Sequence, residues 1–433
     1  MILDRYAQAL QQMPQRLWSG RISKAVAGLI ESVGPHCALG DCCLIRDHAG
    51  HEVEGQVVGF HGSTVLSMPL YPASGVRFGD TVSTWNARPS IRVTERMLGR
   101  VVDAGGEPMD GLAPWSGGER MPVIRTAPNP FDREPIQSPL GTGVRAIDAF
   151  LTCGRGQRVG IFGGSGVGKS TLMGMMARGT SADLTVVALI GERGREVREF
   201  LEDALGDEGR KRSIVVVSTS DQSPLLRLRA AQSAHSIAEY FAARGKHVLL
   251  VLDSITRFAM AQREIGLAAG EPPTAKGYTP SVFTLLSQLV ERAGNFRNGS
   301  ITAFYTVLME GDDQMDPIVD AVRSLLDGHI LLDRRLTSEG HFPPIQLLES
   351  LSRLMPAVCS SEHLHKAQRL RRMLADYTRS EDLIRIGAYQ RGSDPDLDRA
   401  MQVMPNLRAF ARQGAGEVAP IERSIPSLLT MAE

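Results

Sequence analysis

A glycine-rich octapeptide decides the fold of this chain: Gly163-Gly164-Ser165-Gly166-Val167-Gly168-Lys169-Ser170. It fits the phosphate-loop pattern G-x-x-x-x-G-K-[S/T] at every position. An apolar run at 158–162 comes before it and predicts a strand, and the helical run Thr171-Leu-Met-Gly-Met-Met comes after it. A chance match to the pattern rarely lies between a strand and a helix. The octapeptide therefore predicts a nucleoside triphosphate site on a strand–loop–helix unit.

The chemistry of such a loop gives each residue type a task. Glycines let backbone N–H groups curl around phosphate oxygens, and the start of the following helix adds a favourable field. Lys169 is expected to contact the β- and γ-phosphates, and the Ser170 hydroxyl is expected to bind Mg²⁺. The residues predicted to bind the nucleotide here are Gly163, Gly164, Ser165, Gly166, Val167, Gly168, Lys169, Ser170 and Thr171.

Around the loop, from 141 to about 353, apolar runs alternate with longer helical stretches. The predicted strands lie at 158–162, 185–190, 213–218, 247–252, 300–308 and 328–332. Helices between such strands indicate βαβ units and a mostly parallel sheet. Before this part, turn signals such as Gly105-Gly106 suggest that 92–138 is a connecting region.

Two of the predicted strands end in acidic residues. The run 247–252 leads to Asp253, and an acid at the tip of a neighbouring parallel strand can hold the Mg²⁺ shell. The run 185–190 leads through Gly191 to Glu192, whose carboxylate could orient and polarise an attacking water. On spacing alone, a surface ion pair between Glu192 and Arg193 explains this pair of residues equally well.

The two ends of the chain have a different pattern of apolar residues. Residues 2–17 carry apolar residues at spacings of three and four, which predicts an amphipathic helix that packs on its own domain or docks a partner. Short alternating runs at 20–90 predict a small β-barrel. Helical runs at 363–379 and 396–412 predict a helical C-terminal domain. The fold class is α/β, a RecA-like parallel-sheet ATPase core between these parts, with domains at 1–18, 19–90, 91–354 and 355–433.

Composition narrows the class of protein. Lys plus Arg and Asp plus Glu both total 48, so the formal net charge is zero, which argues against a general nucleic-acid binder. The 5 cysteines are odd in number and scattered, as in a reduced cytosolic protein. Cys37, Cys42 and Cys43 lie near histidines but match no zinc-site spacing. We expect no transmembrane helix and no signal peptide, hence a cytoplasmic protein.

Four stretches together carry a family resemblance: residues 163–170, Gly191-Glu-Arg-Gly-Arg-Glu-Val197, Asp253-Ser-Ile-Thr-Arg-Phe258 and Gly299-Ser-Ile-Thr-Ala-Phe-Tyr305. They resemble the flagellar and type III secretion ATPase family, which is related to the catalytic subunits of rotary ATP synthases. Further matching stretches lie at 276–283, 310–313, 324–330 and 387–395. The resemblance spans nearly the whole chain. It implies a hexameric motor that uses ATP and Mg²⁺ and couples hydrolysis to chaperone release, unfolding and entry of export substrates.

The resemblance also implies roles for single residues. Glu192 matches the water-activating carboxylate, Arg193 a residue near the γ-phosphate, and Asp253, with Ser170, the metal site. Arg353, in Ser350-Leu-Ser-Arg353, matches an arginine finger that completes the neighbouring subunit's site, so Glu192, Lys169, Arg193 and Arg353 are the expected catalytic residues. Phe342 matches an aromatic position near the adenine, where the family often has tyrosine.

The partners implied are a homohexamer, a stator-like regulator on the N-terminal helix, a central stalk protein, export-gate membrane proteins and chaperone–substrate complexes, with no nucleic acid. The loop at 266–277 falls where such hexamers line their channel. The location implied is the cytoplasm, at the inner-membrane export apparatus.

Two stretches favour the flagellar branch over the injectisome branch. They are Glu310-Gly-Asp-Asp-Gln-Met-Asp-Pro317 and Lys276-Gly-Tyr-Thr-Pro280.

Three other functions are compatible with a phosphate loop. An RNA-translocating, terminator-like hexamer needs a basic, aromatic β-domain, whereas residues 20–90 offer Phe60, Tyr71, Phe78 and Trp85 without a basic stripe. A non-catalytic, nucleotide-holding subunit would lack the carboxylate that Glu192 supplies. A rotary ATP synthase catalytic-type subunit is the nearest rival, and the wording of 191–197 and the short N-terminal helix point away from it.

Overall fold

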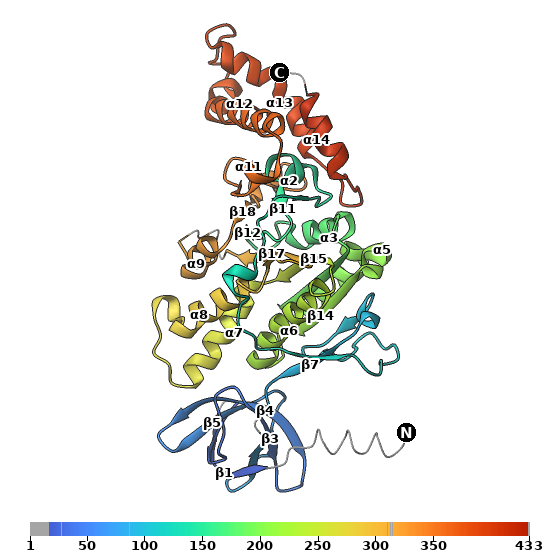
Figure 1. The fold of residues 1–433 in the computed structure, drawn as a ribbon. Helices are drawn as coiled ribbons and strands as arrows, with labels where there is room; N and C mark the ends of the chain where they lie inside the picture. The colour runs from blue at the N-terminus through green and yellow to red at the C-terminus, as the bar shows by residue number, and fades with distance from the viewer. Residues whose placement is uncertain are drawn as a thin grey trace.

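The computed structural model describes residues 17–26, 28–85, 87–309, 311, 313 and 315–431. The chain forms three parts in a row, a barrel, a central α/β part and a group of helices, and Figure 1 shows the central part between the other two. This arrangement confirms the predicted fold class. The helix predicted at 2–17 lies outside the described residues, apart from Leu17.

The first part is a closed barrel of antiparallel strands in the order β1-β2-β5-β4-β3-β6. Alternate residues of the strands point inward, so Ile22, Ile30, Cys43, Ile45 and Val82 form its small core. Such alternation is the signal by which a barrel is predicted. The strands are β1 Trp18–Val26, β2 Leu29–Val33, β3 Cys42–Arg46, β4 Glu52–His61, β5 Thr64–Pro69 and β6 Thr81–Thr84.

The central part is built on a sheet of nine strands, of which eight follow the order β19-β18-β12-β17-β15-β13-β14-β8. All neighbours from β18 to β8 run parallel, and the short β19 and β16 are antiparallel to theirs. The strands are β8 Val101–Val102, β12 Arg158–Gly163, β13 Leu184–Glu192, β14 Ser213–Thr219, β15 His247–Asp253, β16 Gly294–Asn295, β17 Ser300–Leu308, β18 Gly328–Leu331 and β19 Leu351–Ser352. The six strands predicted from the sequence are therefore all present.

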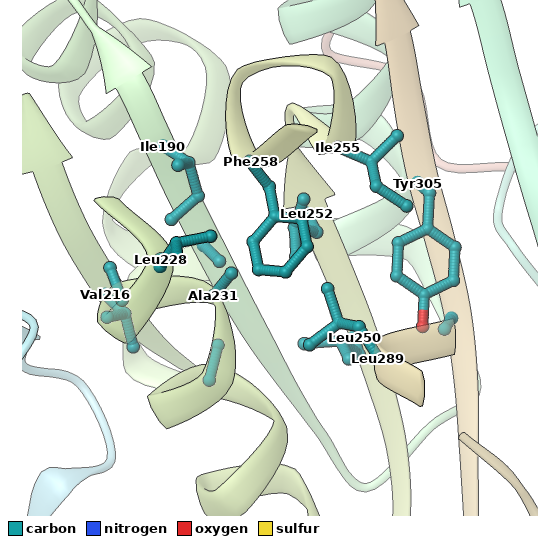
Figure 2. Packing of buried hydrophobic residues seen from close by; sticks show 14 of the residues in the cluster. Ile190, Val216, Leu228, Ala231, Leu250, Leu252, Ile255, Phe258, Leu289 and Tyr305 are labelled. Carbon is teal, nitrogen blue, oxygen red and sulfur yellow. The ribbon is translucent and has the colours of Figure 1, made fainter. Parts of the chain in front are cut away.

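Helices cover both faces of this sheet, which explains why its strands read as unbroken apolar runs. Along β13, Val186, Ala188 and Ile190 join one core cluster, while Val187 and Leu189 join the other. Figure 2 shows the first cluster, where Phe258 of α7 lies among Leu250 and Leu252 of β15. Helices α6 Pro224–Ala242, α7 Ile255–Ala268, α8 Pro280–Val290 and α9 Pro317–Leu325 contribute to this face, and α2 Arg145–Phe150 and α3 Lys169–Gly179 to the other.

The region at 92–138 is more than the connection that its turn signals predict. Its two-residue strand β8 extends the main sheet beside β14, and strands β7 Ser90–Val93 and β9 Glu119–Pro122 pair with each other. A two-residue strand is too short to give a period-two signal, which is why the sequence did not reveal it. Two single turns, η1 Glu95–Met97 and η2 Pro130–Asp132, and the strand pair β10 Pro139–Leu140 and β11 Cys153–Gly154 complete the approach to the core.

The predicted loop at 266–277 begins too early. Helix α7 runs to Ala268, so Gly266 is helical, and the turn η4 Ala275–Gly277 follows later. A glycine is used here because the chain comes close: a Cβ on Gly266 would lie 2.5 Å from the Oγ1 atom of Thr279. Glycine marked a close contact between α7 and the start of α8, not a mobile loop.

The third part consists of three helices, α12 Ser361–Arg385, α13 Pro395–Ala411 and α14 Ile421–Leu429, which lie together at one end of Figure 1. Ser360 and Asp394 cap α12 and α13 with side-chain oxygens, and this confirms the predicted C-terminal helices. Further helical elements of the central part are α4 Gly194–Glu199, the π-helix η3 Phe200–Leu205, α5 Gly206–Lys211 and α10 Arg334–Ser338, and the short α11 Met355–Val358 leads to α12. Within the described residues, no helix is both long and apolar enough to cross a membrane.

Candidate active site

The phosphate loop joins the end of β12 to the start of α3. Gly166 and Gly168 have φ values of 76° and 100°, in the left-handed region where a side chain would be strained. The turn that they allow places Lys169 at the first position of α3, and its Nζ atom donates a hydrogen bond to the Gly163 carbonyl at 3.0 Å and another to the Gly164 carbonyl. The lysine is thus held over its own loop, where phosphate oxygens would bind.

Asp253 ends β15, two strands away from the phosphate-loop strand. Its side chain is buried, and Thr306 of β17 donates a hydrogen bond from its Oγ1 atom to the Asp253 carboxylate. Burial raises the pKa of Asp253, while the Thr306 hydrogen bond and the charges of Lys169 and Arg257 oppose the rise. The hydrogen bond fixes the carboxyl group in place, and a further positive charge beside it would favour its ionised form.

Glu192 ends β13, the next strand, just after a break in the strand register. The break lies between Ile190 and Glu192, and Gly191 within it has a φ of 70°. Burial, the charge of Asp253 and a hydrogen bond with Glu196 raise the pKa of Glu192 to about 8, against the opposite effect of Arg257. A carboxyl group with a pKa near neutrality suits proton transfer.

These side chains line one pocket of about 540 Å³, a size within the usual range for small-molecule sites. The structure brings together in it most of the residues that the sequence singled out: Ser165, Gly166, Gly168, Lys169, Ser170, Thr171, Glu192, Arg193 and Asp253. Gly163, Gly164 and Val167 are not among the residues that line it, and Val167 is buried.

Several residues of the site went unassigned in the sequence, and three of them act on its two acids. Glu196 and Arg257 line the same pocket, and Thr306 holds Asp253. Glu196 and Arg257 lie in the first turn of α4 and of α7, directly after the strands that end in Glu192 and Asp253, so their position was a usable signal. Thr306 meets Asp253 only through the order of β15 and β17 in the sheet, which no local pattern reveals.

The alternative explanation of Glu192 and Arg193 as a surface ion pair does not match the structure, where Arg193 pairs with Glu196. Arg193 is exposed, and its ion pair at 3.9 Å is with Glu196. Exposed pairs at such a distance contribute little to stability. The pairing therefore leaves the Arg193 guanidinium able to turn toward a ligand in the pocket.

Arg353 lies away from this pocket. It follows β19 at the far edge of the sheet, its side chain is exposed, and its backbone N–H donates to the Asp327 carbonyl at 3.0 Å. It is not among the residues that line the chain's own phosphate-loop pocket.

Phe342 lies near the mouth of the phosphate loop without lining the pocket. Its ring is 47% exposed, and its carbonyl accepts a hydrogen bond of 2.8 Å from the backbone N–H of Gln413. Pro344, two residues later, lies next to the loop, since a Cβ on Gly168 would be 3.9 Å from the Pro344 Cδ atom. The backbone around Phe342 thus lies between the phosphate loop and the segment that follows α13.

A parallel sheet with a phosphate loop on one strand and acids at the tips of neighbouring strands defines a phosphate-loop ATPase with a RecA-like core. The ATP synthase alpha/beta family nucleotide-binding domain model matches residues 143–352, and the model of the T3SS EscN ATPase C-terminal domain matches residues 359–430. The chain belongs to the flagellar and type III secretion ATPase family, and is an ATPase of that protein-export class.

The similarity extends over nearly the full length. A flagellum-specific ATP synthase from Bacillus subtilis is 51% identical over 414 residues, which cover 95% of this chain and 94% of the relative. A type 3 secretion system ATPase from Sinorhizobium fredii is 47% identical over 417 residues, covering 96% and 92%. The assembled ATPase EscN from the type III secretion system of enteropathogenic E. coli superposes with a TM-score of 0.90 at 43% identity, covering 95% of this chain and 99% of EscN. The family predicted from the sequence is confirmed.

Proposed function

We propose that this chain hydrolyses ATP in the pocket between the phosphate loop, Glu192 and Asp253. The observation that supports this most directly is that both carboxylates end strands facing Lys169 and Ser170 within one pocket. Lys169 neutralises the β- and γ-phosphates, and Glu192 orients the attacking water and accepts its proton. Arg193 approaches the γ-phosphate from the rim, and the Phe342 ring packs near the adenine.

Mg²⁺ fits the donor set of this pocket. The Ser170 hydroxyl and the Asp253 carboxylate are hard oxygen donors, and Mg²⁺ characteristically takes one or two such groups together with phosphate oxygens and waters. The buried Asp253, whose pKa is raised by its burial, would gain a counter-charge from the ion. Bound there, Mg²⁺ would neutralise the charge on the β- and γ-phosphates.

We propose further that six copies assemble and that Arg353 completes the neighbour's pocket. Its exposed position outside the chain's own pocket supports a role in trans, as an arginine finger. Solved structures of EscN describe that ATPase as assembled and in complex with its central stalk EscO. A homohexamer around a central stalk is the corresponding proposal for this chain.

The cellular task that we propose is to drive protein export, with release of chaperones, unfolding and entry of substrates at the export gate. A stator-like regulator would bind residues 1–18, and the hexamer would sit in the cytoplasm against the inner-membrane export apparatus. We favour the flagellar branch and the domain division at 1–18, 19–90, 91–354 and 355–433. The match of residues 359–430 to an EscN C-terminal domain supports an export ATPase over an RNA-translocating hexamer.

Replacement of Glu192 tests the proposed chemistry. Glu192→Gln keeps the shape and hydrogen-bonding capacity of the side chain but cannot accept a proton from water. We expect ATP to bind with nearly unchanged affinity and turnover to fall by about 10²-fold or more. Nucleotide titration by fluorescence and phosphate release measure the two quantities. Wild-type turnover in this variant would remove Glu192 from the mechanism.

Replacement of Arg353 tests the assembly. Arg353→Ala is expected to lower turnover by about 10³-fold, the size of effect that arginine fingers have elsewhere. Nucleotide binding by the separated subunit should stay the same, because Arg353 lies outside that pocket. A monomeric preparation with full activity would contradict the role in trans.

A further inference from the structure

The segment that carries Arg353 is fixed from the side of the sheet. Strand β19 pairs with β18, and the Arg353 N–H bonds to Asp327. Within the segment, the Ser350 Oγ atom donates to the Gln346 carbonyl at 2.6 Å and accepts from the Leu331 N–H at 2.9 Å. These contacts hold one side of residues 346–353.

The segment is also held by a residue from the C-terminal helices. Arg371, in the middle of α12, donates from its Nη2 atom to the Ser350 carbonyl at 2.9 Å, with a weaker contact to the Leu348 carbonyl at 3.4 Å. Arg371 thus connects the C-terminal helices to Ser350, three residues before Arg353.

The surroundings of Arg371 suit this task. Its side chain is partly buried, burial lowers its pKa, and it makes no ion pair with a carboxylate within the part of the chain that the structure describes. A guanidinium removed from water needs hydrogen-bond acceptors, and a guanidinium also presents several donors in a fixed plane. Here the acceptors are carbonyls of the 346–353 segment, so the charge is directed at this segment and not at an acid.

We propose that Arg371 is a positioning residue for Arg353: it fixes the Ser350 and Leu348 carbonyls so that the exposed Arg353 guanidinium enters the neighbouring subunit's pocket at the right place. The inference rests on the proposed role of Arg353 in trans. It also makes the finger sensitive to α12, because a shift of that helix moves two carbonyls close to Arg353 in sequence.

The first experiment compares variants of adjacent residues on α12. Arg371→Gln removes the charge and shortens the reach, and we expect kcat to fall by about 10²-fold, since a displacement of about 1 Å can have that effect. The KM for ATP should change little, because the chain's own pocket is untouched. Arg371→Lys keeps the charge and one donor and should recover part of kcat. Arg372→Gln, at the exposed neighbouring position, is the matched control and should behave as wild type.

A mixing experiment separates a role in trans from damage to the subunit itself. Glu192→Gln subunits have an inactive pocket and an intact finger, whereas Arg371→Gln subunits have an intact pocket and a displaced finger. In random mixed hexamers, about one interface in four joins the intact pocket to the intact finger, because head-to-tail contacts pair unlike surfaces. Turnover of the mixture should therefore rise well above that of either variant alone.

A parallel mixture of Arg353→Ala and Glu192→Gln subunits tests the underlying function by itself. Recovery in this mixture but not with Arg371→Gln would overturn the inference about Arg371 and leave the finger in place. No recovery in either mixture would overturn both. Wild-type kcat in Arg371→Gln, or a loss confined to KM for ATP, would also overturn the inference. Size-exclusion chromatography of each variant verifies that hexamers form.

Discussion

At the scale of single residues, the pocket places two carboxyl groups where each opposes the ionisation of the other. Burial and the charge of Asp253 raise the pKa of Glu192 to about 8. A group with a raised pKa is protonated below that pH, and a protonated carboxyl cannot accept a proton from water. The pH profile of kcat/KM reports the ionisation of the free enzyme. We therefore expect kcat/KM for ATP to rise as pH increases through about 8.

Glu196 supplies a matched variant for this profile. Its hydrogen bond and its charge contribute to the raised pKa of Glu192. In Glu196→Gln the charge is gone, so the midpoint of the kcat/KM profile should move to lower pH. Steady-state phosphate release over a pH series measures both profiles. A flat wild-type profile, or a midpoint that moves upward in the variant, would contradict this account of Glu192.

Site residues could be predicted where they belong to a motif of residues adjacent in sequence. Residues 163–170 form a complete motif, and Glu192 and Asp253 each end a run of apolar residues. Thr306 could not be predicted, because it meets Asp253 across two strands that are 53 positions apart at this point. Arg371 was missed for the same reason: its carbonyl partner is 21 positions away.

At the scale of elements, helix α3 packs tightly against the π-helix η3 behind the phosphate loop. A Cβ on Gly174 would lie 2.3 Å from the carbonyl oxygen of Ala204, a backbone atom that cannot swing away. Alanine favours a helix over glycine by about 1 kcal/mol, but overpacking costs about 1–3 kcal/mol. We expect Gly174→Ala to be destabilising overall and to lower the melting temperature by a few degrees.

The control for this prediction is Gly194→Ala, at the start of α4. A Cβ there would meet nothing within 4 Å, so the melting temperature should stay close to that of the wild type. Thermal unfolding without nucleotide compares the two variants. An equal or higher melting temperature for Gly174→Ala would mean that η3 moves away from α3 without cost.

Long helices and strands could be predicted from the sequence more easily than short ones. The long strands β13, β15 and β17 are buried on both faces, so their sequences are mostly apolar and easily recognised. The strand β8 has two residues, and it belongs to the sheet because β14 lies beside it. The loop predicted at 266–277 began too early because Gly266 lies inside α7, where it makes room for Thr279.

At the scale of the whole molecule, the pairing of strands β1 and β6 closes the barrel. Strand β1 begins at Trp18, which pairs with Thr84 of β6. Deletion of 1–17 is therefore expected to leave basal ATP hydrolysis close to that of the full chain and to abolish binding of a stator-like partner. Phosphate release and a binding titration with that partner measure the two effects. Loss of soluble, folded protein on deletion would instead assign 1–17 to the packing of the barrel.

The order of the three parts could be predicted, because each has its own periodicity: alternation in the barrel, mixed runs in the core and helical spacing at the end. Contacts between the parts could not. Gln413, for example, is a buried polar side chain whose amide donates to the Gly143 carbonyl at 2.7 Å, 270 positions away. Such contacts depend on how folded helices and strands pack against one another, and the local sequence does not encode that packing.

The exposed place of Arg353, outside its own subunit's pocket, has a consequence for the economy of the cell. If Arg353 completes the neighbour's pocket, as we propose, a single subunit has a pocket without its finger and is nearly idle by itself. Newly made copies would then accumulate without draining ATP, and consumption would begin where copies meet in a ring. Fuel use would be confined to finished machines through the geometry of one side chain.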